Sequence, residues 1–223
     1  MNAPALETIA IETAPGPVAS IIWMHGLGAD GEDFVPVAEQ MPLPVAVRYV
    51  FPHAPMQPVT INGGYVMRAW YDIIATNIGA QQDEAGIRNS QAEIEKLIAQ
   101  ERERGVAAEN IYLAGFSQGG AIALHTGIRH AERLGGIIAL STYLPLAQTL
   151  PQEASAACRE LPIFMAHGSG DPIVPYELGR ASADKLEGWG YPLDWHEYEM
   201  PHSVCMEEIG DLASWLGRQL GRS

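Results

Sequence analysis

Apolar residues in this chain gather in short continuous runs, and longer amphipathic stretches lie between the runs. The runs are rich in Val, Ile, Tyr and Phe and are bounded by Gly or Pro, a pattern typical of buried strands. A clear amphipathic stretch extends from Asp83 to Arg104, where apolar residues at helical spacing predict a helix that covers a sheet. We expect strands within residues 18–25, 44–52, 109–116, 134–141, 161–168 and 192–199.

The alternation of strands and helices predicts the fold class. It is typical of an α/β fold, a mostly parallel twisted sheet with helices on both faces, because parallel strands need crossover connections of helical length. No repeat, low-complexity tract or linker interrupts the 223 residues, which favours a single domain over residues 1–223. Residues 52–82 form a long stretch without clear periodicity, and loops of that length in compact domains are usually functional.

Charge and composition argue against several classes of function. The formal net charge of −14 at pH 7 repels phosphate backbones and anionic membrane surfaces, so we expect no nucleic-acid partner. The N-terminus lacks a basic start followed by an apolar core, and no run of about 18 apolar residues occurs, so we expect a cytoplasmic protein without stable membrane insertion. Cys158 and Cys205 do not form a Cys-x-x-Cys motif, and we expect both to be small buried side chains.

The segment Gly115-Phe116-Ser117-Gln118-Gly119 carries a specific chemical signal. It matches Gly-x-Ser-x-Gly, with a predicted strand before it and an apolar helix after it, which is the context of a nucleophile elbow. Glycines on both sides of the serine leave room where strand and helix cross, and the helix N-terminus aims free backbone N–H groups at developing negative charge. The pattern predicts Ser117 as a nucleophile, although a Gly-rich turn with a capping serine has the same form.

A serine hydroxyl needs a base to take its proton and an acid to orient that base. Seven histidines compete, and the chain order Ser, Asp, His of such hydrolases favours His202, in a loop between the last strand and the last helix. Asp171 lies in a Gly-rich turn after a buried strand, where its carboxylate can reach an imidazole, although Asp before Pro is also a common turn residue. The joint order of Ser117, Asp171 and His202 predicts a catalytic triad.

A second glycine-rich segment, HGLGADG at residues 25–31, follows the first predicted strand. Its Gly-x-Gly-x-x-Gly spacing resembles a dinucleotide-binding loop, but that fold needs an acid about 20 residues further on, and residues 46–56 contain none. In a serine hydrolase the loop after this strand donates a backbone N–H to the oxyanion. We therefore expect the N–H groups of Leu27 and Gln118 to form the oxyanion hole.

Five segments, HGLGADG, RAWYD, GFSQGG, GDPIVP and PHSV, together resemble the small carboxylesterase and acyl-protein thioesterase family of α/β-hydrolases. The resemblance extends over about residues 18–216 and implies an α/β-hydrolase fold and a serine esterase without cofactor or metal, with the triad and oxyanion donors at the positions given above. It also implies that Trp70 and Tyr71 border the acyl site, although core packing is an equally good explanation for these aromatic residues. A homodimer is a further implication of the resemblance.

Family members cleave carboxylic esters, thioesters or lysophospholipids. We expect a serine carboxylesterase that hydrolyses small acyl esters or thioesters of short to medium chain length through an acyl-enzyme, with acyl-protein thioesterase and lysophospholipase as alternatives. A zinc hydrolase is disfavoured because residues 196–202 lack His-Glu-x-x-His spacing, and a non-catalytic binding protein on the same fold is the rival from another class. Residues 142–160 leave room for a loop and a short helix but not for a cap domain, so we expect an open site.

Overall fold

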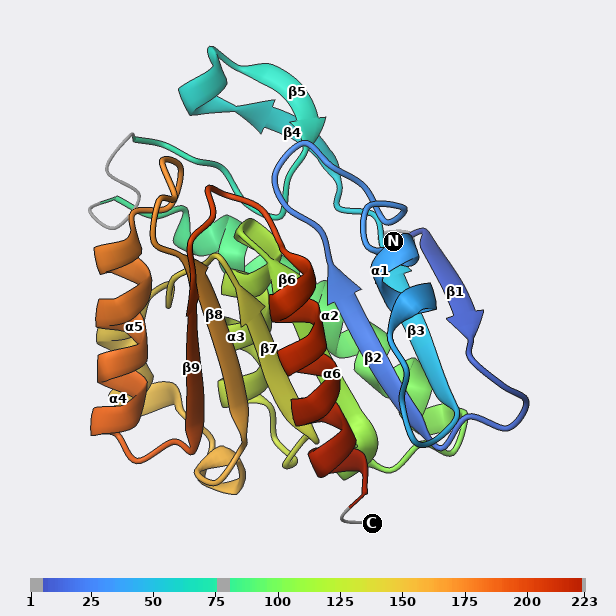
Figure 1. Ribbon diagram of the computed structural model, residues 1–223. Helices are drawn as coiled ribbons and strands as arrows, with labels where there is room; N and C mark the ends of the chain where they lie inside the picture. Colours follow the sequence, from blue (N-terminus) through green and yellow to red (C-terminus); the bar gives the residue numbers. More distant parts are fainter. Residues whose placement is uncertain (1–5, 76–80, 222–223) are drawn as a thin grey trace.

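A twisted seven-stranded sheet forms the centre of the computed structural model, which describes residues 6–75 and 81–221 (Figure 1). The strand order is β1-β3-β2-β6-β7-β8-β9, and every neighbouring pair is parallel except β1 and β3. The strands are β1 (Thr8–Glu12), β2 (Ala19–Met24), β3 (Val47–Pro52), β6 (Ile111–Phe116), β7 (Gly136–Leu140), β8 (Ile163–Gly168) and β9 (Leu193–Tyr198).

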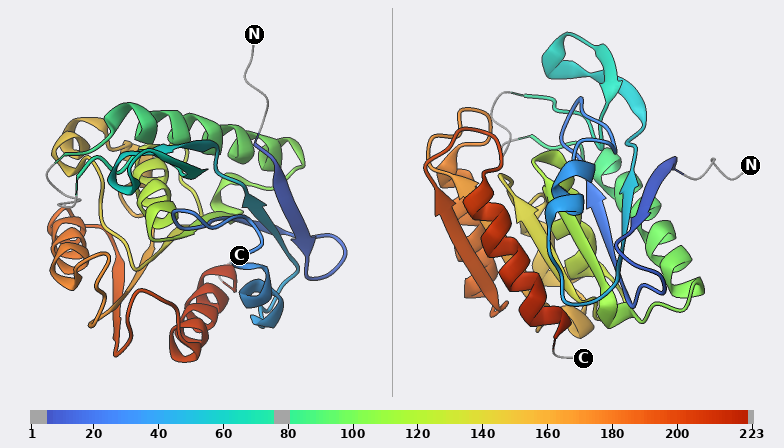
Figure 2. Two further views of the ribbon diagram at one scale, coloured as in Figure 1. Left: turned by 90° about the horizontal axis from the view of Figure 1, so that it is seen from above. Right: turned by 45° about the vertical axis from the view of Figure 1, so that its right-hand side comes forward.

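Helices cover both faces of this sheet (Figure 2). Two apolar clusters lie on the two faces of the sheet because successive side chains of a strand point to opposite faces: in β2, Ile22 packs into one cluster, and Ile21 and Trp23 pack into the other. The first cluster contains residues of α2 (Glu84–Glu103), α3 (Gln118–Arg129), α4 (Leu150–Glu153) and α5 (Tyr176–Gly188); the second contains residues of α1 (Val35–Gln40) and α6 (Met206–Leu220). The predicted α/β fold with helices on both faces is confirmed.

The predicted elements are present at the expected positions. All six apolar runs contain a strand of the sheet, and the predicted helix over residues 83–104 is α2. Asp83 caps this helix, since its side chain accepts a hydrogen bond from the N–H of Gly86 at 2.9 Å. The buried side chains of α2 include Ile87, Ile94 and Leu97, the face that the apolar spacing indicated.

Residues 52–82 contain structure that the sequence did not indicate. β4 (Met56–Val59) and β5 (Tyr65–Arg68) pair as an antiparallel hairpin around a 3₁₀ turn at Thr60–Asn62. The hairpin projects beyond the carboxyl ends of the parallel strands, at the top of Figure 1. β5 exposes the consecutive residues Tyr65 and Val66 to solvent, so this strand lacks the alternation of buried and exposed positions that marks a half-buried strand.

The connection between β7 and β8 contains only α4 and two 3₁₀ turns, Ala147–Thr149 and Ala156–Cys158, which leaves no cap domain there, as expected. Within residues 6–75 and 81–221, none of the helices is long and apolar enough to cross a membrane. The loops after β2, β6, β8 and β9 leave from the carboxyl ends of parallel strands, the edge at which open α/β sheets bind their ligands.

Candidate active site

Ser117 follows β6 on a sharp turn into α3. Its backbone φ of 55° and ψ of −120° are strained for a residue with a Cβ atom. Two hydrogen bonds hold the turn: the Ser117 N–H donates to the carbonyl of Leu140 at 2.8 Å, and the Ser117 carbonyl accepts from Oγ1 of Thr142 at 2.6 Å. This is the strained strand-to-helix geometry that the Gly-x-Ser-x-Gly pattern predicted.

The glycines beside Ser117 are required by close packing. A Cβ atom on Gly115 would lie 2.2 Å from the carbonyl carbon of Gly119. A Cβ atom on Gly119 would lie 2.3 Å from the carbonyl oxygen of Met24, at the end of β2. No side chain can occupy these positions unless α3 moves away from the sheet, so the glycines bring the start of α3 against the segment that follows β2.

The side chains of Asp171 and His202 are joined across the ends of β8 and β9. Nδ1 of His202 lies 2.6 Å from Oδ2 of Asp171, whose side chain is fully buried. Oδ1 of Asp171 accepts from the N–H groups of Ile173 and Val174 at 2.8 and 2.9 Å, so both carboxylate oxygens are fixed. Because a carboxylate accepts, Nδ1 of His202 carries the proton, and Nε2 of the neutral imidazole has a free lone pair.

Ser117 and His202 line one cavity of about 500 Å³. The ring of His202 packs on Phe116, with ring centroids 4.7 Å apart, and this contact holds the imidazole over the residue before the elbow serine. Most of the remaining wall is apolar and includes Ile61, Ile73, Tyr143, Ile173 and Val174. The cavity therefore combines a serine, an oriented imidazole and apolar walls.

Both predicted oxyanion residues also line this cavity. A Cβ atom on Gly26 would lie 3.5 Å from the Cβ of Ser117, so the loop after β2 passes directly beside the elbow. Gln118 is the first residue of α3, and its N–H has no acceptor within the helix. The N–H of Leu27 has no acceptor in the part of the chain that the structure describes. These two N–H groups are available to an oxygen atom of a substrate.

Comparison with known proteins identifies the family of this chain. Residues 7–219 match the family model described as phospholipase/carboxylesterase. The chain belongs to this family of serine hydrolases. Acyl-protein thioesterase 1 of Mycosarcoma maydis is 39% identical over 95% of this chain and 96% of the relative. Acyl-protein thioesterase 1 of Yarrowia lipolytica is 37% identical over 96% of this chain and 97% of the relative.

Solved structures support the same family and fold. The crystal structure of Arabidopsis thaliana SOBER1 superposes with a TM-score of 0.85 at 31% identity and covers 91% of this chain and 99% of that chain. The crystal structure of Zea mays acyl-protein thioesterase 2 has a TM-score of 0.86 at 28% identity and covers 96% of this chain and 99% of that chain. The α/β-hydrolase fold implied by the family resemblance is therefore shown.

The two aromatic residues expected beside the acyl site take different positions. Tyr71 lines the cavity that contains Ser117. Trp70 is 1% exposed and is not among the residues that line this cavity. Its indole Nε1–H instead donates to the backbone carbonyl of His25 at 2.8 Å. Trp70 is therefore not proposed below as a substrate contact.

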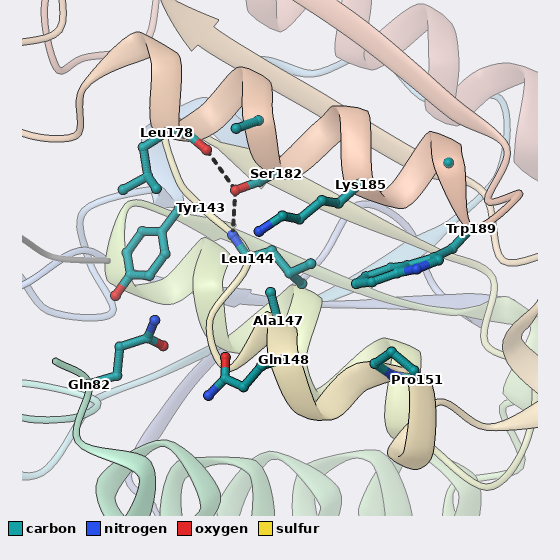
Figure 3. A pocket seen from close by; sticks show the side chains of 12 residues that line it. Gln82, Tyr143, Leu144, Ala147, Gln148, Pro151, Leu178, Ser182, Lys185 and Trp189 are labelled. Atoms are coloured by element: carbon teal, nitrogen blue, oxygen red, sulfur yellow. Dashed lines mark hydrogen bonds between the residues drawn. The ribbon is translucent and has the colours of Figure 1, made fainter. Parts of the chain in front are cut away.

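The cavity also contains residues that the sequence reasoning missed. Ile61 and Asn62 come from the hairpin turn, and Tyr143 comes from the loop after β7. Tyr143 lines a second cavity of about 520 Å³ as well (Figure 3). Its hydroxyl lies 2.8 Å from the hydroxyl of Tyr71. Tyr143 thus stands between the two cavities. No local motif marks these positions, because only the packing of distant segments brings them to the site.

The loop beyond Tyr143 is tied to α5. The Ser182 hydroxyl accepts from the N–H of Leu144 at 3.0 Å and donates to the carbonyl of Leu178 at 2.7 Å (Figure 3). The second cavity lies between these residues and Trp189, at the end of α5. The hydrogen bonds of Ser182 therefore hold the segment that carries Tyr143.

The described residues hold neither a metal-binding cluster nor a disulfide. Among the described residues, no group of three or more His, Cys, Asp or Glu side chains could hold a metal ion. Both cysteines are free thiols. Cys158 is buried as expected, whereas Cys205, the residue before α6, is partly exposed.

Proposed function

We propose that this hydrolase cleaves acyl thioesters and carboxylic esters, with Ser117 as nucleophile, His202 as general base and acid, and Asp171 as the group that orients the imidazole. The observation that carries the proposal is the hydrogen bond of 2.6 Å between His202 Nδ1 and the buried Asp171 Oδ2, with His202 in the wall of the cavity that Ser117 also lines. This bond selects the tautomer in which Nε2 can accept a proton.

The reaction proceeds in two stages. Nε2 of His202 takes the proton of the Ser117 hydroxyl while the oxygen attacks the acyl carbonyl, and the resulting oxyanion accepts from the N–H groups of Leu27 and Gln118. The imidazolium then gives its proton to the leaving thiol or alcohol, and the acyl group stays on Ser117. Water attacks this ester with His202 as base, and the serine and a free carboxylic acid are released. No cofactor takes part in either stage.

The substrate class follows from the family and from the walls of the cavity. The relatives named above are acyl-protein thioesterases, which favours a thioester over the carboxylic ester that the sequence reasoning placed first. Apolar walls suit an acyl chain, and the hydrogen-bonded pair of Tyr71 and Tyr143 closes one side of the cavity. We therefore propose acyl chains of short to medium length on a thiol or alcohol leaving group, with lysophospholipids as the alternative substrates.

A panel of thioesters, p-nitrophenyl esters and lysophospholipids of increasing chain length tests the substrate class. We expect the highest kcat/KM for a thioester of medium chain length. A maximum at lysophospholipids would replace the proposed class by the alternative. Labelling of Ser117 by a fluorophosphonate, with Ser117→Ala as control, tests the nucleophile separately. A chain that neither turns over an ester nor reacts with the probe would be a non-catalytic member of the fold.

A further inference from the structure

Three consecutive peptide groups of the loop after β2 are held by hydrogen bonds. The Trp70 indole Nε1–H donates to the carbonyl of His25 at 2.8 Å. Nδ1 of the His25 imidazole lies 2.7 Å from the carbonyl of Gly26. The N–H of Gly28 donates to the carbonyl of Arg68 at 2.9 Å. The loop is therefore fixed in orientation on both sides of the Leu27 N–H.

The Gly26 carbonyl and the Leu27 N–H belong to the same peptide group. Every described peptide bond is trans, and the C=O and N–H of a trans peptide group point in opposite directions. A donor that fixes the Gly26 carbonyl on one side therefore fixes the direction of the Leu27 N–H on the other side. The hydrogen bond from the imidazole also polarises the peptide group, which strengthens the N–H as a donor.

The tautomer of His25 is determined by its second contact. Nε2 of His25 accepts from the N–H of Ala54 at 3.0 Å, so the proton of the neutral ring is on Nδ1 and points at the Gly26 carbonyl. Burial lowers the pKa of His25 to about 4, which keeps the imidazole neutral at neutral pH. The side chain is 1% exposed, so water does not compete for either nitrogen.

The side chain of Gln118 extends this arrangement to the elbow. Oε1 of Gln118 accepts from the N–H of Trp70, and Nε2 donates to the carbonyl of Tyr71, both at 2.7 Å. Gln118 is 3% exposed, and its own backbone N–H, at the start of α3, is the second of the two proposed oxyanion donors. A continuous chain of contacts thus runs from Gln118 through Trp70 and His25 to the Gly26–Leu27 peptide.

We propose that His25 is a positioning residue that orients the Leu27 N–H toward the reacting carbonyl, and that Trp70 and the Gln118 side chain set the distance between the two oxyanion donors. The inference rests on the proposed function, because it assigns these residues to the same oxyanion hole. Preorganised donors act on the transition state more than on the bound substrate, so the loss of this link lowers kcat and leaves KM nearly unchanged.

Two substitutions at His25 separate its two hydrogen bonds. In His25→Asn the amide nitrogen takes the place of Nδ1 and still donates to Gly26, whereas in His25→Gln the amide reaches the place of Nε2 and only the contact with Ala54 is kept. We expect His25→Gln to lower kcat by about tenfold to a hundredfold and His25→Asn to keep it within about fivefold. Trp70→Phe keeps most of the packing, removes the indole donor and is expected to lower kcat by about tenfold.

The measurements are kcat and KM on a p-nitrophenyl ester, the Ki of a trifluoromethyl ketone that adds to the serine, and the melting temperature. We expect Ki to rise in parallel with the fall in kcat. His125→Gln is the matched control, because His125 is also fully buried and lies 3.1 Å from Gln91, outside the site. This control is expected to lower the melting temperature and leave kcat unchanged.

Equal losses of kcat in His25→Asn and His25→Gln would overturn the inference. So would variants in which kcat is unchanged and only KM rises or the melting temperature falls. Either result would leave the proposed function in place. If the unmodified chain does not hydrolyse the ester, the rate of Ser117 labelling by a fluorophosphonate decides the inference, since its phosphoryl oxygen occupies the same hole. The variants should then rank in labelling rate as they are expected to rank in kcat. A chain that shows neither turnover nor labelling would overturn both proposals.

Discussion

We predict that Glu208 makes the stability of this fold depend on pH. The residue is in the first turn of α6, is 0% exposed, and its Oε2 accepts from the N–H of Cys205 at 3.4 Å. Its Oε1 is buried without a hydrogen-bond partner among the described residues. Burial raises the pKa of this carboxyl from about 4.5 to about 8. Glu208 is therefore protonated in the folded protein at neutral pH.

The direction in which stability changes with pH depends on whether the folded or the unfolded chain loses the Glu208 proton first. Below about pH 4.5 the carboxyl is neutral in the folded and the unfolded chain, and it does not change the free energy of unfolding. As the pH rises to about 8, the unfolded chain releases the proton and the folded chain retains it, so stability falls; above that pH the loss is constant. At about 1.4 kcal/mol for each pH unit the full loss is about 5 kcal/mol, and relaxation around the charge reduces it to about 2–4 kcal/mol.

Glu208→Gln keeps the shape of the side chain and removes the titration. We expect urea unfolding to show nearly equal stability of the two proteins at about pH 4 and an advantage of about 2–4 kcal/mol for the Gln variant at about pH 8. Glu207→Gln changes the exposed neighbour in the same helical turn and serves as the control, with a nearly constant difference over the same range. Parallel stability curves for Glu208→Gln and the unmodified chain would refute the reasoning.

Three further predictions concern the site. Ser117→Ala and His202→Ala should each lower kcat by about four to six orders of magnitude with an unchanged melting temperature, and activity retained in Ser117→Ala would contradict the triad. Leu27→Pro removes a backbone donor and should cost about 3 kcal/mol in transition-state stabilisation, whereas Leu27→Ala keeps the donor and should stay within about tenfold; equal losses would count against this oxyanion assignment. Tyr143→Ala should join the two cavities and move the optimum of kcat/KM to longer acyl groups, whereas Tyr143→Phe should leave this optimum unchanged. The same chain-length profile in both variants would show that Tyr143 does not limit the acyl chain.

The order of Ser117, Asp171 and His202 could be predicted from the sequence because each residue lies in a local pattern. The glycines around Ser117 mark a close strand-to-helix crossing, and the apolar run before Asp171 marks the strand that ends beside it. Parallel strands end at one edge of a sheet, so residues that follow different strands come together whatever the loops between them. Local pattern and topology together were sufficient for the predicted triad.

The role of Trp70 was decided by tertiary structure alone. Its indole reaches the carbonyl of His25, 45 residues earlier, and its N–H reaches the Gln118 side chain, 48 residues later. The pairing of Tyr71 with Tyr143 likewise joins residues that are 72 positions apart. The sequence determined the alternation of strands and helices and the positions of the proposed triad residues, because both depend on neighbouring side chains. Which polar atoms face the site depends on how distant segments pack, and a single chain contains no local signal for that choice.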